Sequence, residues 1–318
     1  MGNIINNDLL ENNWHQGELT VQKRAGTYQL MAEIGPKFIR QFMPQQHRDF
    51  FQSLSMLFIG YPDSSLNQST SISHASVLFG AVGFILSPSE TELIINTQNS
   101  MGDFNNNSVN VGDRIGLVGI EFETKRRNRV NAIVTDISQK NITVSILQSY
   151  GNCPKYIQPK KLIINRHYDR STSASHVEFN DIVRNIIVNA DTFFIASSFN
   201  DGKGINNRGV DMSHRGGEAG FISINEDGQL LVPDYAGNGF FNTLGNLVKN
   251  PMASLLFCDW QQGLSLQLTV SGETLWHNDA LTDNNNKQGQ QKVERTLRFT
   301  PLNIMLFKDG LAYTNHSQ

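Results

Sequence analysis

Three side chains able to hold an anion stand next to one another in the second half of the chain. Ser213, His214 and Arg215 belong to the run Met212-Ser-His-Arg-Gly-Gly217, which Asp211 precedes. Arginine offers a fixed charge on a forked donor that suits phosphate, and glycines let backbone N–H groups approach a ligand closely. The run therefore predicts an anion cradle, and the alternative is a solvated hairpin turn.

A second segment able to bind an anion follows at residues 229–251. Its pattern predicts a strand over 229–232, a turn rich in Gly and Asn, and a helix over 242–249. The amides and the dipole at the start of this helix, where Asn242 and Thr243 stand, could face an anion. Gly237-x-Gly239-x-x-Asn242 resembles a dinucleotide fingerprint, but the flanking strands are too short and no acidic residue follows at the required distance. The segment predicts a phosphate site without a dinucleotide-binding domain.

The elements that would position these residues occur twice in the chain. A shift of 137 residues without a gap matches Ser76 to Ser213, and it matches Gly80 and Gly83 to two glycines of the second half. Short apolar runs broken by Gly, Asn, Asp and Pro surround these positions in both halves, which is typical of a barrel or sandwich. We expect a mainly β (α+β) chain of two tandem antiparallel split β-barrels, with an N-terminal helical segment and short helices.

The predicted domains are an N-terminal helical segment over 1–50, a first barrel over 51–165 and a second barrel over 166–318. Apolar residues spaced at three and four predict the N-terminal helices, and Pro36 and Pro44 each mark a helix start. Polar residues are concentrated in the second copy, because the first copy has an apolar segment where the second has the anion cradle. We therefore expect one ligand per chain.

Composition excludes several classes of partner. The formal charge of −3, from 26 Lys and Arg against 29 Asp and Glu, gives no field that would attract nucleic acid or an anionic membrane. The first residues lack a signal-peptide pattern and no run is long enough to span a bilayer, so a cytoplasmic location is predicted. Cys153 and Cys258 lie far apart without His at metal-binding spacing, and no metal site is expected. We expect Cys153 to be a packed thiol and Cys258 to lie in the core.

Motifs along both halves match one known family. They are Leu255-Leu-Phe-Cys-Asp-Trp260 and Gln267-Leu-Thr-Val-Ser-Gly272, together with His15-Gln-Gly-Glu18, Arg126-Arg-Asn-Arg-Val-Asn131 and Gly151-Asn-Cys-Pro-Lys-Tyr-Ile157. The first two resemble the FMN-binding split barrel of pyridoxamine 5'-phosphate oxidase and its relatives. The other three resemble a longer, two-barrel subgroup of that family.

The resemblance implies that FMN lies between two barrels and takes contacts from both. It places the phosphate at the run from Asp211 to Arg215 and at Asn242 and Thr243, and it places Gln267 at the isoalloxazine ring. Side chains of the first copy are then candidates to reach across, namely Arg126, Arg127, Arg129, Gln148 and Ser149. The alternative for the arginines is a solvated strand end that pairs with Glu121 and Glu123.

The implied function is an FMN-dependent oxidoreductase that acts on an unidentified small substrate. The alternative is a flavin or haem binding protein or carrier with little turnover, and a cofactor-free barrel pair is disfavoured by the concentrated polarity of the second copy. The helix start lacks the Arg-Lys pair of the oxidase, and no C-terminal Arg-x-His is present, so synthesis of pyridoxal phosphate is not expected. The electron donor is open, and a homodimer is compatible with the sequence.

Overall fold

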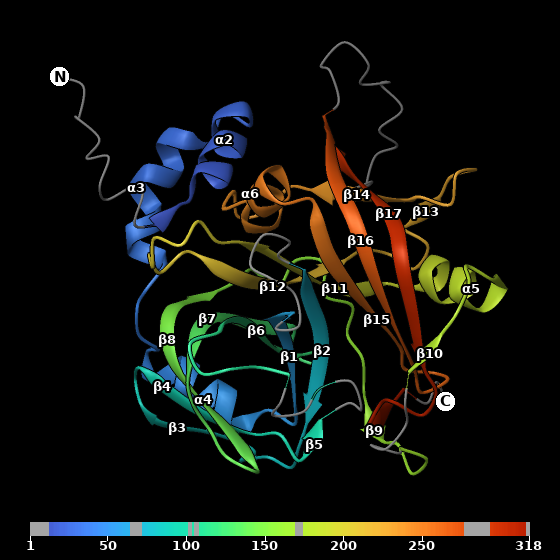
Figure 1. Ribbon diagram of the computed structural model, residues 1–318, viewed down its shortest axis with the longest axis horizontal. Coiled ribbons are helices and arrows are strands. Elements are labelled where there is room, and N and C mark those ends of the chain that lie inside the picture. The colour runs from blue at the N-terminus through green and yellow to red at the C-terminus, as the bar shows by residue number, and fades with distance from the viewer. Residues whose placement is uncertain are drawn as a thin grey trace.

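A computed structural model describes residues 13–63, 72–100, 104, 108–168, 174–276 and 293–315. Two antiparallel sheets, one from each half of the chain, form most of the molecule (Figure 1). The prediction of a mainly β chain with two tandem sheets is confirmed. The predicted domain boundaries stay a prediction. No helix within the described ranges is long and apolar enough to cross a membrane.

The first sheet comes from the first half of the chain. Its strands are β1 (Met56–Pro62), β2 (Ser73–Phe79), β3 (Ile85–Ser89), β4 (Glu92–Asn96), β5 (Asn99–Ser100), β6 (Arg114–Glu121), β7 (Arg126–Ile137) and β8 (Asn141–Gly151). They lie in the order β3-β4-β8-β7-β6-β1-β2-β5. All of their pairings are antiparallel.

The second sheet repeats this arrangement. Its strands are β10 (Ser175–His176), β11 (Thr192–Phe199), β12 (Gly209–Gly216), β13 (Ser223–Ile224), β14 (Leu230–Tyr235), β15 (Met252–Asp259), β16 (Leu264–Trp276) and β17 (Val293–Phe307). Their order is β12-β11-β15-β16-β17-β14-β13, and β10 also pairs with β17. A separate short ladder joins β9 (Ile163–Ile164) to β18 (Tyr313–Thr314).

Helices cover the sheets at a few places. They are α2 (Gln16–Arg24), α3 (Tyr28–Phe38), α4 (Gln45–Ser53), α5 (Asp181–Asn189) and α6 (Asn242–Lys249). The predicted bounds of α6 are confirmed, and Pro44 is the N-cap of α4 as expected. The prediction that Pro36 starts a helix is wrong, because Pro36 lies in the last turn of α3. There proline lacks the N–H that would bond to the carbonyl of Ala32, and the helix ends two residues later at Phe38.

The central strands are buried on both faces. Leu57 and Ile59 of β1 face a core inside the first sheet, whereas Phe58 between them faces a cluster shared by both sheets. On β11, Phe193 faces the core of the second sheet and Phe194 faces the same shared cluster. This double burial explains why both strands read as unbroken apolar runs rather than as alternating patterns.

The shared cluster contains a pair of matching residues from the two copies. The rings of Phe58 and Phe194 stack with centroids 3.5 Å apart and planes 12° apart. Next to them, a Cβ on Gly60 would lie 3.1 Å from the Cβ of Ala196, its counterpart on β11. Matching residues meet in this way at a pseudo-two-fold axis. The ring pair contributes roughly 0.5–1.5 kcal/mol beyond its burial.

The turn after the second strand has the same conformation in both copies. Gly83 and Gly220 adopt positive φ angles of 92° and 88°. The N–H of Phe84 donates to the Ala81 carbonyl at 2.9 Å, and the N–H of Phe221 makes the same bond to Glu218 at 3.0 Å. The matched glycines therefore mark equivalent turns, as the sequence predicts.

The gapless shift of 137 residues does not hold for every strand. Phe58 pairs with Val77 on β2, and Phe194 pairs with His214 on β12. Phe58 therefore matches Phe194 and not Ile195. The connection to the second strand is one residue longer in the second copy, and a one-residue slip moves a side chain to the opposite face of a strand.

Candidate functional site

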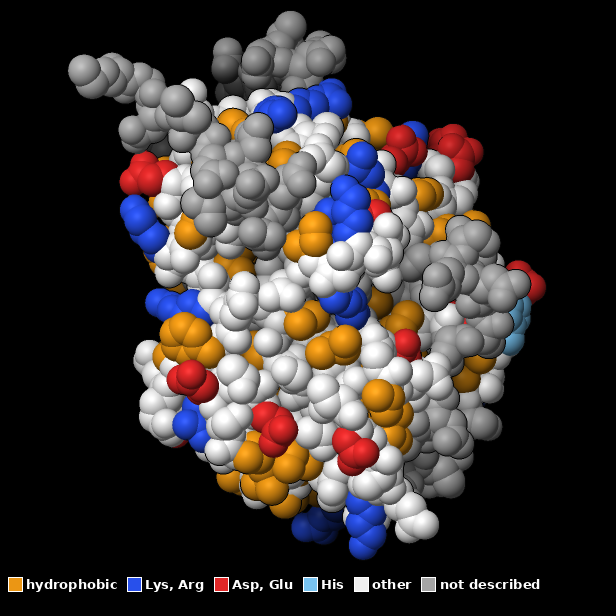
Figure 2. All heavy atoms as spheres, turned by 60° about the vertical axis from the view of Figure 1, so that its left-hand side comes forward, with side chains coloured by type: hydrophobic (Ala, Val, Ile, Leu, Met, Phe, Trp, Pro, Cys, Tyr) orange, Lys and Arg blue, Asp and Glu red, His pale blue; other side chains and the backbone are white. Residues whose placement is uncertain are grey.

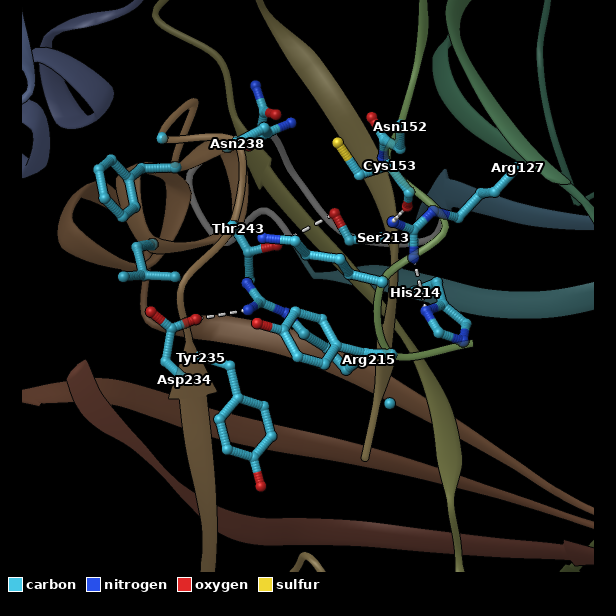
Figure 3. A pocket seen from close by; sticks show the side chains of 18 of the residues that line it. Arg127, Asn152, Cys153, Ser213, His214, Arg215, Asp234, Tyr235, Asn238 and Thr243 are labelled. Carbon is cyan, nitrogen blue, oxygen red and sulfur yellow. Dashed lines mark hydrogen bonds and ion pairs between the residues drawn. The ribbon is translucent and has the colours of Figure 1, made fainter. Parts of the chain in front are cut away.

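A cavity of about 150 Å³ lies where the first sheet meets the second copy (Figure 3). Side chains from β7 and the segment after β8 line one side, and β12, β14, α6 and β17 line the other. The polar and aromatic side chains around it are Arg127, Arg129, Asn152, Cys153, Lys155, Tyr156, Ser213, His214, Arg215, Phe221, Asp234, Tyr235, Asn238, Phe241, Asn242, Thr243 and Arg295. Seven residues predicted as cofactor-binding are among them.

The second copy contributes the hydroxyl groups. Ser213 and Arg215 lie on one face of β12, and His214 lies on the other, because side chains alternate along a strand. The Thr243 hydroxyl donates to Ser213 Oγ at 3.2 Å, and the Ser213 hydroxyl donates to Asp211 Oδ2 at 3.1 Å. The predicted strand and helix segments therefore meet at one point, with Ser213 and Thr243 in contact.

The first copy supplies two of its clustered arginines. Arg127 and Arg129 both line the cavity, whereas Arg126 stacks on Phe50 and donates to the Gln46 carbonyl. The sequence left two interpretations of these arginines open. Arg127 and Arg129 fit the first, in which side chains of the first copy reach across to the second copy. Arg126, at the start of β7, packs instead against α4.

The cavity holds more positive than negative charge. Five cations line it, namely Arg127, Arg129, Lys155, Arg215 and Arg295, and Asp234 is the acid among the lining residues. Asp234 accepts from both Arg215 (2.6 Å) and Arg295 (2.8 Å), and Asp211 behind the wall pairs with Arg129. Within the described part of the chain, Arg127 has no carboxylate partner.

This excess of charge is local. Figure 2 shows basic and acidic side chains interspersed over the face of the molecule that it draws. Together with the net charge of −3, this distribution provides no general attraction for anions. An anion would be held by the cavity itself.

Arg127 fixes the tautomer of His214. Arg127 Nη1 lies 2.7 Å from His214 Nδ1, and because a guanidinium can only donate, Nδ1 must accept and Nε2 must carry the proton. The pKa of His214 is held well below its ordinary 6.5, first by burial and then by the charge of Arg127. His214 is thus a neutral hydrogen-bond donor at physiological pH.

Several donors around the cavity lack a partner. Arg127 Nε, Arg129 Nε, Arg215 Nε and His214 Nε2 are buried and make no hydrogen bond to any described residue. The N-cap of α6 is Phe241 (φ 61°), whose side chain makes no capping hydrogen bond, so the first N–H groups of the helix are left to water or a ligand. Unpaired buried donors are costly, and an anion such as the phosphate of FMN would satisfy them. The residues present fit that group.

Four predicted site residues lie outside the cavity lining. Asp211 stands directly behind it, paired with Arg129. Gln148 accepts from Asn131 Nδ2 at 3.2 Å, and Ser149 Oγ lies 3.0 Å from His47 Nδ1. Gln267 donates to the Ala75 carbonyl at 2.9 Å. The binding roles of these four residues stay predictions.

The position of Gln267 has a simple geometric explanation. Arg129 pairs with Val118 on β6, and Gln267 pairs with Leu256 on β15. Val118 and Leu256 are themselves matching positions, because they pair with Phe58 and Phe194. Gln267 is therefore the counterpart of Arg129 and belongs to the pseudo-symmetric location on the other side of the molecule.

That pseudo-symmetric location is filled by apolar side chains. Val77 and Leu78 stand where the second copy has His214 and Arg215, and both are fully buried. Beside them, the ring of Phe79 packs against Tyr168 and Tyr313. Tyr168, in the segment that connects the two copies, and Tyr313, in the C-terminal segment, thus occupy the space that corresponds to the cavity of the second copy.

Sequence reasoning missed several lining residues and misjudged one. Asp234 and Arg295 come from β14 and β17, and the pairing of these strands brings them together across 61 residues. Tyr156 and Tyr235 stack with ring centroids 5.2 Å apart. The expectation that Cys153 is packed is wrong, because Cys153 is exposed in the segment after β8. Cys258 packs against the shared cluster, and burial raises the pKa of its thiol.

Solved structures of known proteins align with part of the chain, whereas no family model and no curated protein matches it. HupZ of Group A Streptococcus aligns over 44% of this chain and 100% of its own, at 13% identity and a TM-score of 0.32. A candidate pyridoxamine 5'-phosphate oxidase of Lactobacillus delbrueckii aligns over 40% and 93%, at 11% identity and a TM-score of 0.29. A Clostridium acetobutylicum protein of the pyridoxinephosphate oxidase family, related to general stress protein 26, aligns over 43% and 88%, at 14% identity and a TM-score of 0.24. The family indicated by the sequence motifs is thus also named among these structures.

Proposed function

We propose that the cavity binds FMN through its phosphate and that the protein is an FMN-dependent oxidoreductase. The observation that carries the proposal is the set of unpaired buried donors, on Arg127, Arg129, Arg215 and His214, around an excess of positive charge. Of the family motifs in the sequence, Arg126 to Asn131 on β7 and Gly151 to Ile157 from the end of β8 contribute lining residues of this cavity. FMN, when bound, supplies hydride and electron transfer.

Different residues of the cavity bind the phosphate and the ring system of FMN. The guanidinium groups and the start of α6 hold the phosphate, and the hydroxyls of Ser213 and Thr243 offer further hydrogen bonds. The aromatic side chains of Tyr156, Tyr235 and Phe241 line the cavity and suit a planar aromatic group. Because both copies contribute, the fused chain supplies within itself the two halves of the site.

A spectrum and a titration test this function. The purified protein, or the protein after addition of FMN, is expected to show the absorbance bands of oxidised flavin, and FMN is expected to bind more tightly than riboflavin. Riboflavin has the same ring system without the phosphate. Equal affinity for the two, or no binding of either, would overturn the proposal.

A binding protein with little turnover is the second candidate. It is favoured by the neutral state of His214, whose pKa lies well below 6.5, because the cavity then offers no imidazolium for proton transfer at physiological pH. Reoxidation of the bound flavin by oxygen or a quinone, with and without NADPH, separates the two. Sustained turnover supports the oxidoreductase, and a single slow reoxidation supports the carrier.

A further inference from the structure

The N-terminal helix α2 rests directly on α6, whose first turn lines the cavity (Figure 1). The helices meet at Gly17 and Gly245, where a Cβ on Gly17 would overlap the Gly245 carbonyl oxygen. α2 begins with a capping box, in which His15 Nδ1 accepts from the Gly17 N–H (3.0 Å) and Glu18 Oε2 accepts from the His15 N–H (2.7 Å). This start of α2 brings the Glu18 carboxyl against the start of α6.

Glu18 determines how the side chain of Asn242 is turned. Glu18 Oε1 accepts from Asn242 Nδ2 at 2.5 Å. Asn242 Oδ1 is thereby left to accept from Arg129 Nη1 at 3.4 Å and from the Tyr150 hydroxyl at 3.3 Å. The opposite orientation would set the amide N–H₂ group against the Arg129 guanidinium, which has only donors. A residue outside both sheets thus orients a side chain that lines the cavity.

The Glu18 carboxyl is buried, with 2% of the residue exposed. Burial raises its pKa from 4.5 to about 8, and the Asp211 carboxylate adds to the rise. His15 stays neutral, because burial lowers its pKa to about 3. The other titratable or charged groups that face Glu18 from neighbouring elements are Asp211, Arg208, Arg129 and Tyr150.

We propose that Glu18 is a positioning residue of the cavity, and that a proton on Glu18 and an anion in the cavity stabilise each other. Neutral Glu18 still accepts from Asn242, and it leaves the positive end of α6 and Arg129 to the ligand. Ionised Glu18 places a competing negative charge beside both. The coupling is reciprocal, so the anion favours the proton by the same factor as the proton favours the anion. The inference rests on the proposed function only in requiring that the cavity bind an anion.

The test is an FMN titration by fluorescence at pH 7, 8 and 9 on the full chain. A phosphate ester stays a dianion throughout, since its second pKa is about 6. At an assumed separation of about 10 Å and an effective dielectric constant of about 20, the ionised Glu18 carboxylate weakens binding of a dianion roughly a hundredfold. Wild type is expected to lose roughly 5- to 10-fold in affinity from pH 7 to pH 9, and Glu18→Gln to lose less than about twofold. The matched control is Glu33→Gln, at an exposed acid paired with Lys37, and it should follow wild type.

Two further measurements separate positioning from a fold defect. Glu18→Ala removes the acceptor for Asn242 and is expected to weaken FMN at every pH, whereas Glu18→Gln retains an acceptor and rescues affinity at pH 7. Calorimetry of wild type at pH 8, in buffers of different ionisation enthalpy, should show uptake of a fraction of a proton when FMN binds. No uptake, or equal pH dependence in wild type and Glu18→Gln, would overturn the inference.

Failure of the proposed function gives a different result. If FMN does not bind at any pH, the flavin assignment falls, and the same titration is made with sulfate, whose charge is constant over this range. A sulfate affinity that falls with pH in wild type and stays level in Glu18→Gln supports the role of Glu18. No sulfate binding, or equal pH dependence in the two proteins, contradicts it.

Discussion

Arg127 is the cavity cation whose removal should cost the most anion affinity. Arg129 pairs with Asp211, and Arg215 pairs with Asp234, whereas Arg127 has no acid partner among the described residues. Burial, together with the charges of Arg129 and Arg215, lowers the pKa of Arg127 to about 10. A bound anion would relieve that repulsion. We therefore predict that Arg127→Gln weakens FMN binding strongly.

The magnitude follows from one charged hydrogen bond. Such a bond contributes roughly 1.5–3 kcal/mol, and each 1.4 kcal/mol is a factor of about ten, so the expected loss is roughly ten- to a hundredfold. Glutamine removes the charge and keeps an amide that can donate to His214. Arg215→Ala should fall toward the lower end of that range, because Asp234 retains Arg295 and Arg215 already commits Nη1 to Asp234.

The assay compares FMN with riboflavin in wild type and variants by fluorescence titration. Arg126→Gln is the matched control, since Arg126 is the next residue on β7 and lies outside the cavity lining. Arg127→Gln should weaken FMN and leave riboflavin nearly unchanged, and Arg126→Gln should change neither. Thermal unfolding of the apoproteins checks that the variants fold.

Three results would refute this reasoning. Arg127→Gln could leave FMN affinity unchanged, it could weaken FMN and riboflavin equally, or Arg126→Gln could have the same effect. The first would place the phosphate elsewhere, and the second would make the loss a matter of packing. The third would mean that the loss of affinity comes from the total positive charge of β7 and not from the position of Arg127 in the cavity.

Three further predictions concern stoichiometry, packing and pH. Flavin extracted from FMN-saturated protein should amount to one per chain, because Val77 and Leu78 fill the second location, and a ratio near two would contradict this. Gly17→Ala should lower stability by roughly 1–3 kcal/mol in denaturant titrations, because its Cβ would overlap Gly245, and an unchanged midpoint would exclude the close contact. Glu18 has a pKa of about 8 in the fold against an ordinary 4.5, so between these values the folded state holds a proton that the unfolded state lacks. Stability of wild type should fall as pH rises through that window, by at most about 1.4 kcal/mol per pH unit, and Glu18→Gln should lack that fall when unfolding is followed from pH 5 to pH 8.

Local signals were enough to predict the repeated elements. Gly83 and Gly220 mark turns that need positive φ, and this requirement is visible in sequence because it is set within a few residues. The helix from Asn242 to Lys249 was likewise bounded by its own turn and by Asn-Pro. The sequence alignment of β1 with its counterpart β11 was wrong by one residue, because a difference in the length of the following loop leaves no trace in strand composition.

The site was predictable in part, for a physical reason. The anion-binding residues of β12 and α6 are recognisable as residue types next to glycines. Their charge balance is set by long-range pairing, and nothing near Arg215 in sequence indicates that Asp234 would neutralise it. Glu18 was missed for the same reason. The capping box of α2 can be read from His15 to Glu18, but the burial of its carboxyl depends on contact with a helix more than 200 residues away.

The stacked pair of Phe58 and Phe194 marks a pseudo-two-fold axis. Because one chain forms both copies, the residues on the two sides of this axis need not be identical. In a dimer of identical chains, every substitution on one side of such an axis is copied to the other, so a gain at one site cannot be separated from a loss at its twin. In this chain the two sides mutate independently. One location is a charged cavity, and the other is part of the hydrophobic core. The apolar location thus adds packing that holds the two copies together around the cavity.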